Sequence, residues 1–139
     1  MNRISVKPIL VREESLIDRI EFKDCVFIDL KVDDNSINKL PGFEDALVFF
    51  QQLKASEKED GKFLIFTCAC GVADDGGWRG VKVSHKNGRV RCDFIKETSL
   101  SFEFSEEEYS SEIASCRKSL EKYSDYPLEP HQILYPEDW

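Results

Sequence analysis

Residues 62–104 read KFLIFTCACGVADDGGWRGVKVSHKNGRVRCDFIKETSLSFEF and contain the strongest strand signals of the chain. The segment opens with a run from Lys62 to Cys70 in which both alternating sets of side chains are apolar. Such a run is typical of a central strand that is covered on both faces. A glycine-rich loop follows over residues 71–78. We therefore place the centre of a β-sheet in this segment.

A β-hairpin is predicted after the loop. Asn87-Gly88 is the preferred dipeptide of a two-residue type I′ turn. Pairing outward from that turn separates an apolar from a polar face. The pairs of the apolar face are His85–Val90, Val83–Cys92 and Val81–Phe94, and those of the polar face are Ser84–Arg91 and Lys82–Asp93.

The end of this segment and the regions on either side of it predict three more strands and two helices. Alternation indicates strands over residues 4–11, 24–32 and 99–104, and a turn or short helical piece over 13–18. Apolar spacing of three to four residues predicts helices over 43–55 and 105–123. Ser105 and Glu108 have the spacing of a capping box at the start of the second helix.

These elements predict an α+β fold. We expect a mostly antiparallel sheet of about five to six strands, with the two principal helices packed against it. A length of 139 residues is that of a single domain, residues 1–139. Residues 126–139 hold three of the five prolines and are expected to form an irregular C-terminal tail that lies against the body.

Composition restricts the class of partner. The formal net charge is −8, which disfavours nucleic acid and anionic membranes and suits a basic protein partner.

We see neither a signal peptide nor a run of about 20 apolar residues that could span a bilayer, so we expect a cytoplasmic protein. The five cysteines have irregular spacing and are expected to be thiols. No cofactor is predicted.

Cysteine and histidine residues suggest one candidate chemical site. Cys68, Cys70, His85 and Cys92 include the ligand types of a zinc site. The spacing of these residues is not that of a zinc knuckle, and buried thiols behave as small hydrophobic groups. Redox chemistry at Cys68 and Cys70 is the other possibility, although acidic neighbours raise the pKa of a thiol. We favour structural thiols and predict no metal.

Other catalytic patterns are weaker. The glycines of the loop do not match a nucleotide-binding motif, and Asp74-Asp75 would repel phosphate. Two adjacent aspartates could act in acid–base catalysis, but they are also ordinary turn residues. His85 and His131 lack a recognisable nucleophile motif. The protein is therefore predicted not to be an enzyme.

Protein binding is the remaining class of site. The candidate contact residues are Asp33, Asp34, Asp74, Asp75 and Trp78, which all fall in predicted loops. A tryptophan among carboxylates has the composition of an interface anchor with a charged rim. The alternative is that Trp78 folds back over the sheet.

The run from Phe66 to Trp78, followed by VKVSH at residues 81–85, resembles small bacterial proteins with a TCxCGxxxCxG strand-loop-hairpin signature. The strand ending Phe102-Glu103-Phe104-Ser105 and Tyr109 in the next helix are similar to a later part of the same pattern. Asp74-Asp75 stand where that signature has its third cysteine. Proteins of this kind include immunity proteins of contact-dependent or polymorphic toxin systems, and the resemblance implies a non-catalytic inhibitor.

The predicted function combines charge and resemblance. We expect a protein-binding protein of the immunity type that neutralises a basic, nuclease-like toxin by occluding its active site. The alternative is a metal-binding or small enzymatic domain that uses Cys68, Cys70, His85 and Cys92. A structural subunit of a larger assembly is a third possibility.

Overall fold

The computed structural model describes residues 1–17, 19–70, 72, 80–95, 100–131, 133–137 and 139. In chain order the strands are β1 (Ile4–Val11), β2 (Ser15–Ile17), β3 (Ile20–Phe22), β4 (Cys25–Val32), β5 (Asn35–Ser36), β6 (Ala46–Val48), β7 (Gly61–Phe63), β8 (Phe66–Cys68), β9 (Val81–Lys86), β10 (Arg89–Phe94) and β11 (Leu100–Ser105). The helices are α1 (Phe50–Ala55) and α2 (Glu106–Leu120), with short 3-10 turns η1 (Ile37–Lys39) and η2 (Glu121–Tyr123).

Within these ranges the strands form four small sheets instead of the single sheet that was predicted. The two larger sheets have the strand orders β1-β4-β5 and β11-β10-β9-β7, and the two smaller ones are β2-β3 and β6-β8. All strand pairs within these sheets are antiparallel. The α+β class is therefore confirmed, and the layout of the sheet is corrected.

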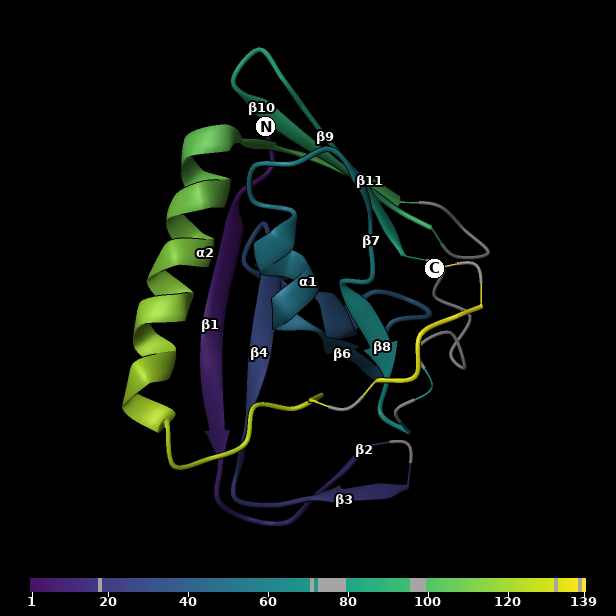
Figure 1. Ribbon diagram of the computed structural model, residues 1–139, viewed down its shortest axis with the longest axis vertical. Coiled ribbons are helices and arrows are strands. Elements are labelled where there is room, and N and C mark those ends of the chain that lie inside the picture. Colours follow the sequence, from purple (N-terminus) through teal and green to yellow (C-terminus); the bar gives the residue numbers. More distant parts are fainter. Residues whose placement is uncertain (18, 71, 73–79, 96–99, 132, 138) are drawn as a thin grey trace.

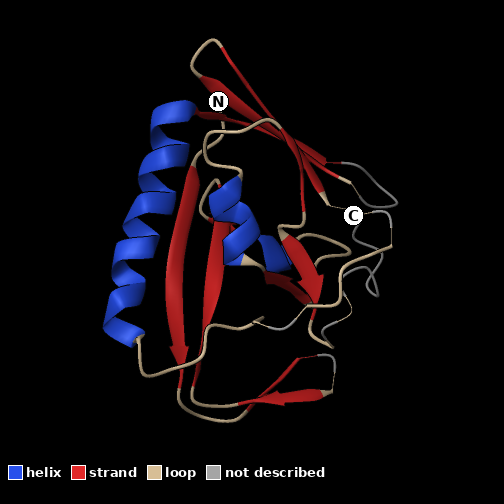
Figure 2. Ribbon diagram, in the orientation of Figure 1, coloured by secondary structure: helices blue, strands red, loops and turns tan. Residues whose placement is uncertain are grey.

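Figure 1 shows α2 lying along β1 at one side of the molecule, with the β9–β10 hairpin at one end and β2–β3 at the other. Figure 2 shows the strands occupying the rest of the body around the short helix α1. The hydrophobic core lies between these layers. It includes Tyr109, Ile113 and Cys116 of α2, which are each 0–1% exposed.

The hairpin confirms the predicted register. His85 pairs with Val90, Val83 with Cys92 and Val81 with Phe94. The turn residues Asn87 and Gly88 have φ angles of 53° and 75°, the left-handed conformation that a type I′ turn requires. The predicted strands over 4–11 and 24–32 match β1 and β4 to within one residue.

The apolar run 62–70 is not one central strand. Its first residues form β7 in the four-stranded sheet, and Phe66–Cys68 form β8 beside β6. Between them Leu64 and Ile65 are 0% and 1% exposed. The Leu64 N–H donates to Gln52 Oε1 at 2.9 Å, and the Ile65 carbonyl accepts from the Phe49 N–H at 2.7 Å. Both faces of the run are apolar because the chain crosses the core from one sheet to another.

The predicted helix over 43–55 is shorter in the structure. Residues 46–48 form strand β6, and α1 begins only at Phe50. All five residues from Ala46 to Phe50 are buried, so they present no polar face. In a run that is apolar all round, periodicity does not distinguish a strand from a helix.

Residues 13–18 were expected to form a turn or helical piece, but Ser15–Ile17 pairs with Ile20–Phe22 as a hairpin.

The C-terminal tail packs against the body. The Val26 N–H donates to the Pro127 carbonyl, and the Glu129 N–H donates to the Val26 carbonyl, each at 2.9 Å. Leu134 forms a parallel bridge with Val72. The Trp139 ring lies over Gly80, where an added Cβ would be 2.5 Å from the nearest ring carbon. The tail thus ties the β4 sheet to the four-stranded sheet.

Candidate functional site

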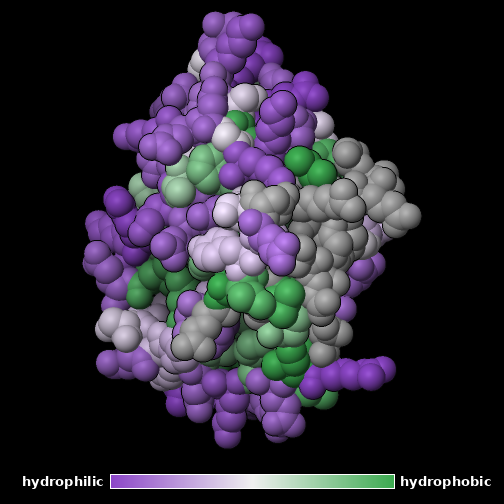
Figure 3. Space-filling model, turned by 45° about the vertical axis from the view of Figure 1, so that its right-hand side comes forward, coloured by the Kyte–Doolittle hydropathy of each residue, from purple (hydrophilic) through white to green (hydrophobic). Residues whose placement is uncertain are grey.

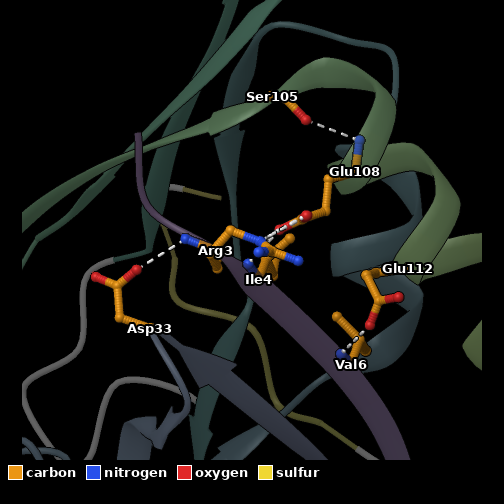
Figure 4. Close-up of polar contacts among 7 residues, drawn as sticks. All are labelled: Arg3, Ile4, Val6, Asp33, Ser105, Glu108 and Glu112. Carbon is orange, nitrogen blue, oxygen red and sulfur yellow. Dashed lines mark hydrogen bonds and ion pairs between the residues drawn. The ribbon is translucent and has the colours of Figure 1, made fainter.

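Asp33, one of the predicted contact residues, lies in the turn between β4 and β5 and bonds to the N-terminal segment (Figure 4). Its Oδ1 accepts from the Arg3 N–H at 2.8 Å and its Oδ2 from the Asn2 amide at 2.7 Å. The Arg3 N–H, followed by the Asn2 amide, lowers the pKa of the Asp33 carboxyl below its ordinary value. Asp33 therefore anchors the start of β1, and its carboxylate is already hydrogen-bonded.

Two glutamates of α2 bind the free edge of β1 (Figure 4). The Ile4 N–H donates to Glu108 Oε1 at 2.8 Å, and the Val6 N–H donates to Glu112 Oε1 at 3.2 Å. Arg3 adds an ion pair to Glu108 at 2.9 Å. An unpaired strand edge invites pairing with other chains, and here a helix covers it. These carboxylates therefore serve the fold.

The predicted capping box is half formed. Ser105 Oγ accepts from the Glu108 N–H at 3.0 Å, as predicted for the N-cap of α2. The Glu108 carboxylate reaches across to Arg3 and Ile4. Sequence spacing alone could not show this second use of Glu108, because Ile4 is 104 residues away.

The other predicted contact residues divide into two groups. Asp34 is exposed next to Asp33 and has a φ of 66°. Asp74, Asp75 and Trp78 lie outside the described residues. The placement of a combined acidic surface around Trp78 therefore stays a prediction.

The polar face of the four-stranded sheet is basic, a feature absent from the predictions made from the sequence. The hairpin register places Lys82, Ser84 and Lys86 on one strand across from Asp93, Arg91 and Arg89 on the next. Lys62 of β7 and Glu103 of β11 extend the same face. We call this set, Lys62, Lys82, Ser84, Lys86, Arg89, Arg91, Asp93, Ser101 and Glu103, the basic face. It could have been identified from the predicted hairpin by reading the outward residues together.

The basic face is hollowed. A depression of about 500 Å³ is lined by Ser84, Lys86, Asn87, Arg89, Arg91 and Glu103. Arg89 pairs with Glu103 at 2.9 Å, and Arg91 pairs with Asp93 at 3.0 Å. The three lysines add to the positive charge of the face. The hairpin end of the molecule is hydrophilic in Figure 3.

Charge is therefore segregated on this protein. Five cations and two carboxylates give the basic face a formal charge of +3. The other described residues include 12 Lys and Arg and 20 Asp and Glu, so they carry a formal charge of −8. A surface divided in this way orients a charged partner as it approaches.

The four residues of the metal-binding alternative do not lie on one sheet, and Cys70 lies in the turn after β8. Cys68 ends β8, whereas His85 and Cys92 belong to β9 and β10. His85 instead contacts Asp60 Oδ1 through Nδ1 at 2.8 Å and the Glu57 carbonyl through Nε2 at 2.9 Å. No group of three or more His, Cys, Asp or Glu side chains that could hold a metal occurs within the described part of the chain. The structure thus gives no support to the metal-binding alternative.

Cys92 belongs to a buried polar group around Tyr109. The hydroxyls of Tyr109 and Ser56 are 2.6 Å apart, and Ser56 Oγ also donates to the Leu53 carbonyl at 2.6 Å. Ser56 is 0% and Tyr109 1% exposed. Burial raises the pKa of Cys92 to about 12 and that of Cys116 to about 11. These thiols are protonated and inaccessible at neutral pH, as expected for structural cysteines.

Comparisons with protein-family models, with curated proteins and with solved structures gave no match. The resemblance to small bacterial immunity proteins therefore stays a prediction. Of the helices within the described ranges, none has the length and apolar character needed to cross a membrane.

Proposed function

We propose that this is a non-catalytic binding protein of the immunity type, which neutralises a basic protein toxin by covering its active site. The toxin would be nuclease-like, because a nuclease binds an anionic substrate through basic residues. Carboxylates of this protein would occupy the place of that substrate.

The observation that carries the proposal is the segregation of charge. Outside the basic face the described residues carry a formal charge of −8, against +3 on that face. A basic partner is attracted to the carboxylate-rich surface and repelled by Lys62, Lys82 and Lys86. Complementary potentials of this kind raise the association rate and fix the orientation of the complex.

Among the proposed contact residues that lie in the described part of the chain, Asp34 suits this role best. It is exposed, whereas neighbouring Asp33 is held by Asn2 and Arg3. We assign Asp34, together with Asp74, Asp75 and Trp78, to the contact surface, and assign Asp33 to positioning the turn that carries Asp34.

Affinity capture from a lysate of the protein's own host, at low and at high salt, tests the proposal. We expect a basic protein in a one-to-one complex that dissociates as salt rises, since exposed charges are screened. The captured protein should be toxic when expressed alone and harmless when expressed with this protein. A captured partner that is acidic, or that retains its activity in the complex, would contradict the proposal.

A further inference from the structure

The side chains of Cys68 and Cys70 meet at the end of β8. Their sulfur atoms are 3.2 Å apart, with the Cys70 thiol directed at Cys68 Sγ. This separation exceeds the roughly 2.05 Å of a disulfide bond, and both residues are thiols. The contact arises because the chain turns at Ala69–Cys70, where a continuous strand had been predicted.

The two thiols differ in exposure. Cys70 is exposed, whereas Cys68 is 3% exposed. Cys70 is therefore open to an external reagent, whereas Cys68 is shielded from it. Cys70 Sγ also lies 3.9 Å from the Val72 carbonyl, beside the bridge between Val72 and Leu134.

We propose that Cys68 and Cys70 form a thiol–disulfide exchange site that takes a small-molecule disulfide as its oxidising substrate. Cys70 is the attacking thiol and Cys68 is the resolving thiol. Redox-sensitive cysteine pairs have this arrangement: an exposed thiol reacts first, and a neighbouring thiol then displaces the adduct.

The reaction proceeds in two balanced steps. In the first, the Cys70 thiolate attacks one sulfur of the substrate, a Cys70–substrate disulfide forms, and the substrate S–S bond breaks to release one thiolate. In the second, the Cys68 sulfur attacks Cys70 Sγ and the Cys68–Cys70 bond forms. The second substrate sulfur leaves with the Cys68 proton as a thiol. The protein dithiol is oxidised by two electrons, and the substrate disulfide is reduced to two thiols.

The other cysteines supply an internal comparison. Cys25, Cys92 and Cys116 are each 1–2% exposed. Burial raises the pKa of all three thiols. None of them should react in the folded protein, so the exchange is confined to one pair.

The test uses oxidised glutathione as the probe, on the full chain under native conditions, with acid quenching and intact-mass measurement. The wild-type protein should lose two hydrogens and two reactive thiols without retaining glutathione. Its tryptic peptide 63–79 should contain the Cys68–Cys70 link. Dithiothreitol should restore the dithiol.

Two variants separate the steps. Cys68→Ala should stop after the first step and keep one glutathionyl group on Cys70. Cys70→Ser, at an exposed position that tolerates the change, should not react. The matched control Cys116→Ala removes a buried thiol outside the pair. It should form the Cys68–Cys70 disulfide as the wild type does.

Two results would overturn the proposal. One is a wild-type protein that accumulates a stable glutathione adduct on Cys70, which would show that Cys68 does not resolve it. The other is a Cys70 that does not react while the protein is folded. Both outcomes are read from the wild type alone, so they do not depend on the folding of a variant.

Discussion

At the scale of single residues, carboxylates and hydroxyls in this protein hold elements together. Asp33 bonds to Asn2 and Arg3, and Ser56 bonds to Tyr109 across the core. In both cases the partners lie at least 30 residues apart in the chain. Each residue therefore joins segments that local structure alone would not connect.

Asp33→Asn should reduce stability at neutral pH. Asparagine tolerates the positive φ of 51° at this position, so the change removes charge and not backbone fit. Folding lowers the pKa of the Asp33 carboxyl. Its contribution to the free energy of unfolding is therefore present above the ordinary pKa of aspartate and is lost as the pH falls through the lowered pKa of the folded protein. Urea unfolding at pH 7 should show a deficit against the wild type that disappears in strong acid. Asp34→Asn is the matched control and should show a smaller deficit.

Ser56→Ala should cost about 1–3 kcal/mol, because it removes a hydrogen-bond partner from the Tyr109 hydroxyl within the core. Tyr109→Phe should cost less, because Ser56 keeps its bond to the Leu53 carbonyl. Urea unfolding of both variants measures the difference. Equal losses would mean that the shared Ser56–Tyr109 bond accounts for both, and that the bond of Ser56 to Leu53 and the unpaired Tyr109 hydroxyl add little.

At the scale of elements, α2 does more than cover the core. Its glutamates accept hydrogen bonds from the backbone of β1, and Ser105 caps its first turn. The helix thus closes an edge of the β1-β4-β5 sheet. The contact between α2 and β1 connects segments far apart in the sequence, because β1 is the first strand and α2 follows β11.

Glu108→Ala should destabilise the protein by about 1–3 kcal/mol, because it leaves the Ile4 N–H without its acceptor. Glu107→Ala is the matched control: it lies in the same first turn, so it loses a similar interaction with the helix dipole, but it is exposed. Amide hydrogen exchange should accelerate at Ile4 in the first variant only. Unchanged exchange at Ile4 would mean that the carboxylate does not close the edge.

At the scale of the whole molecule, the distribution of charge matters more than its total. The net value of −8 conceals a basic face of +3 on one sheet. Approach of a charged partner depends on this distribution and weakens as salt is added. The two sides of the protein should therefore respond oppositely to charge reversal.

Asp34→Lys should slow association with the captured basic partner at low salt and flatten the dependence of the rate on salt. Lys82→Glu, which makes the basic face less positive, should leave the rate unchanged or raise it. Stopped-flow or surface-based kinetics at two salt concentrations measure both variants. If Lys82→Glu slows association as Asp34→Lys does, the basic face is part of the contact, and carboxylates alone do not hold the partner.

Sequence alone was sufficient where the signal was local. The Asn87-Gly88 turn set the register of the hairpin, and alternation located β1 and β4. The Ser105 cap and the apolar spacing located α2. These signals depend on side-chain period and turn geometry, which a short segment carries by itself.

Only the tertiary structure decided how distant segments meet. The run 62–70 divides between two sheets because Leu64 and Ile65 are buried on all sides, and residues 46–48 become a strand because β8 pairs with them. The uses of Asp33 and Glu108 and the contact of Cys68 with Cys70 depend likewise on the path of the chain. Alternation and charge establish which residues are apolar, acidic or reactive. Packing between segments determines which atoms those residues reach, because that free energy comes from contacts made across the whole fold.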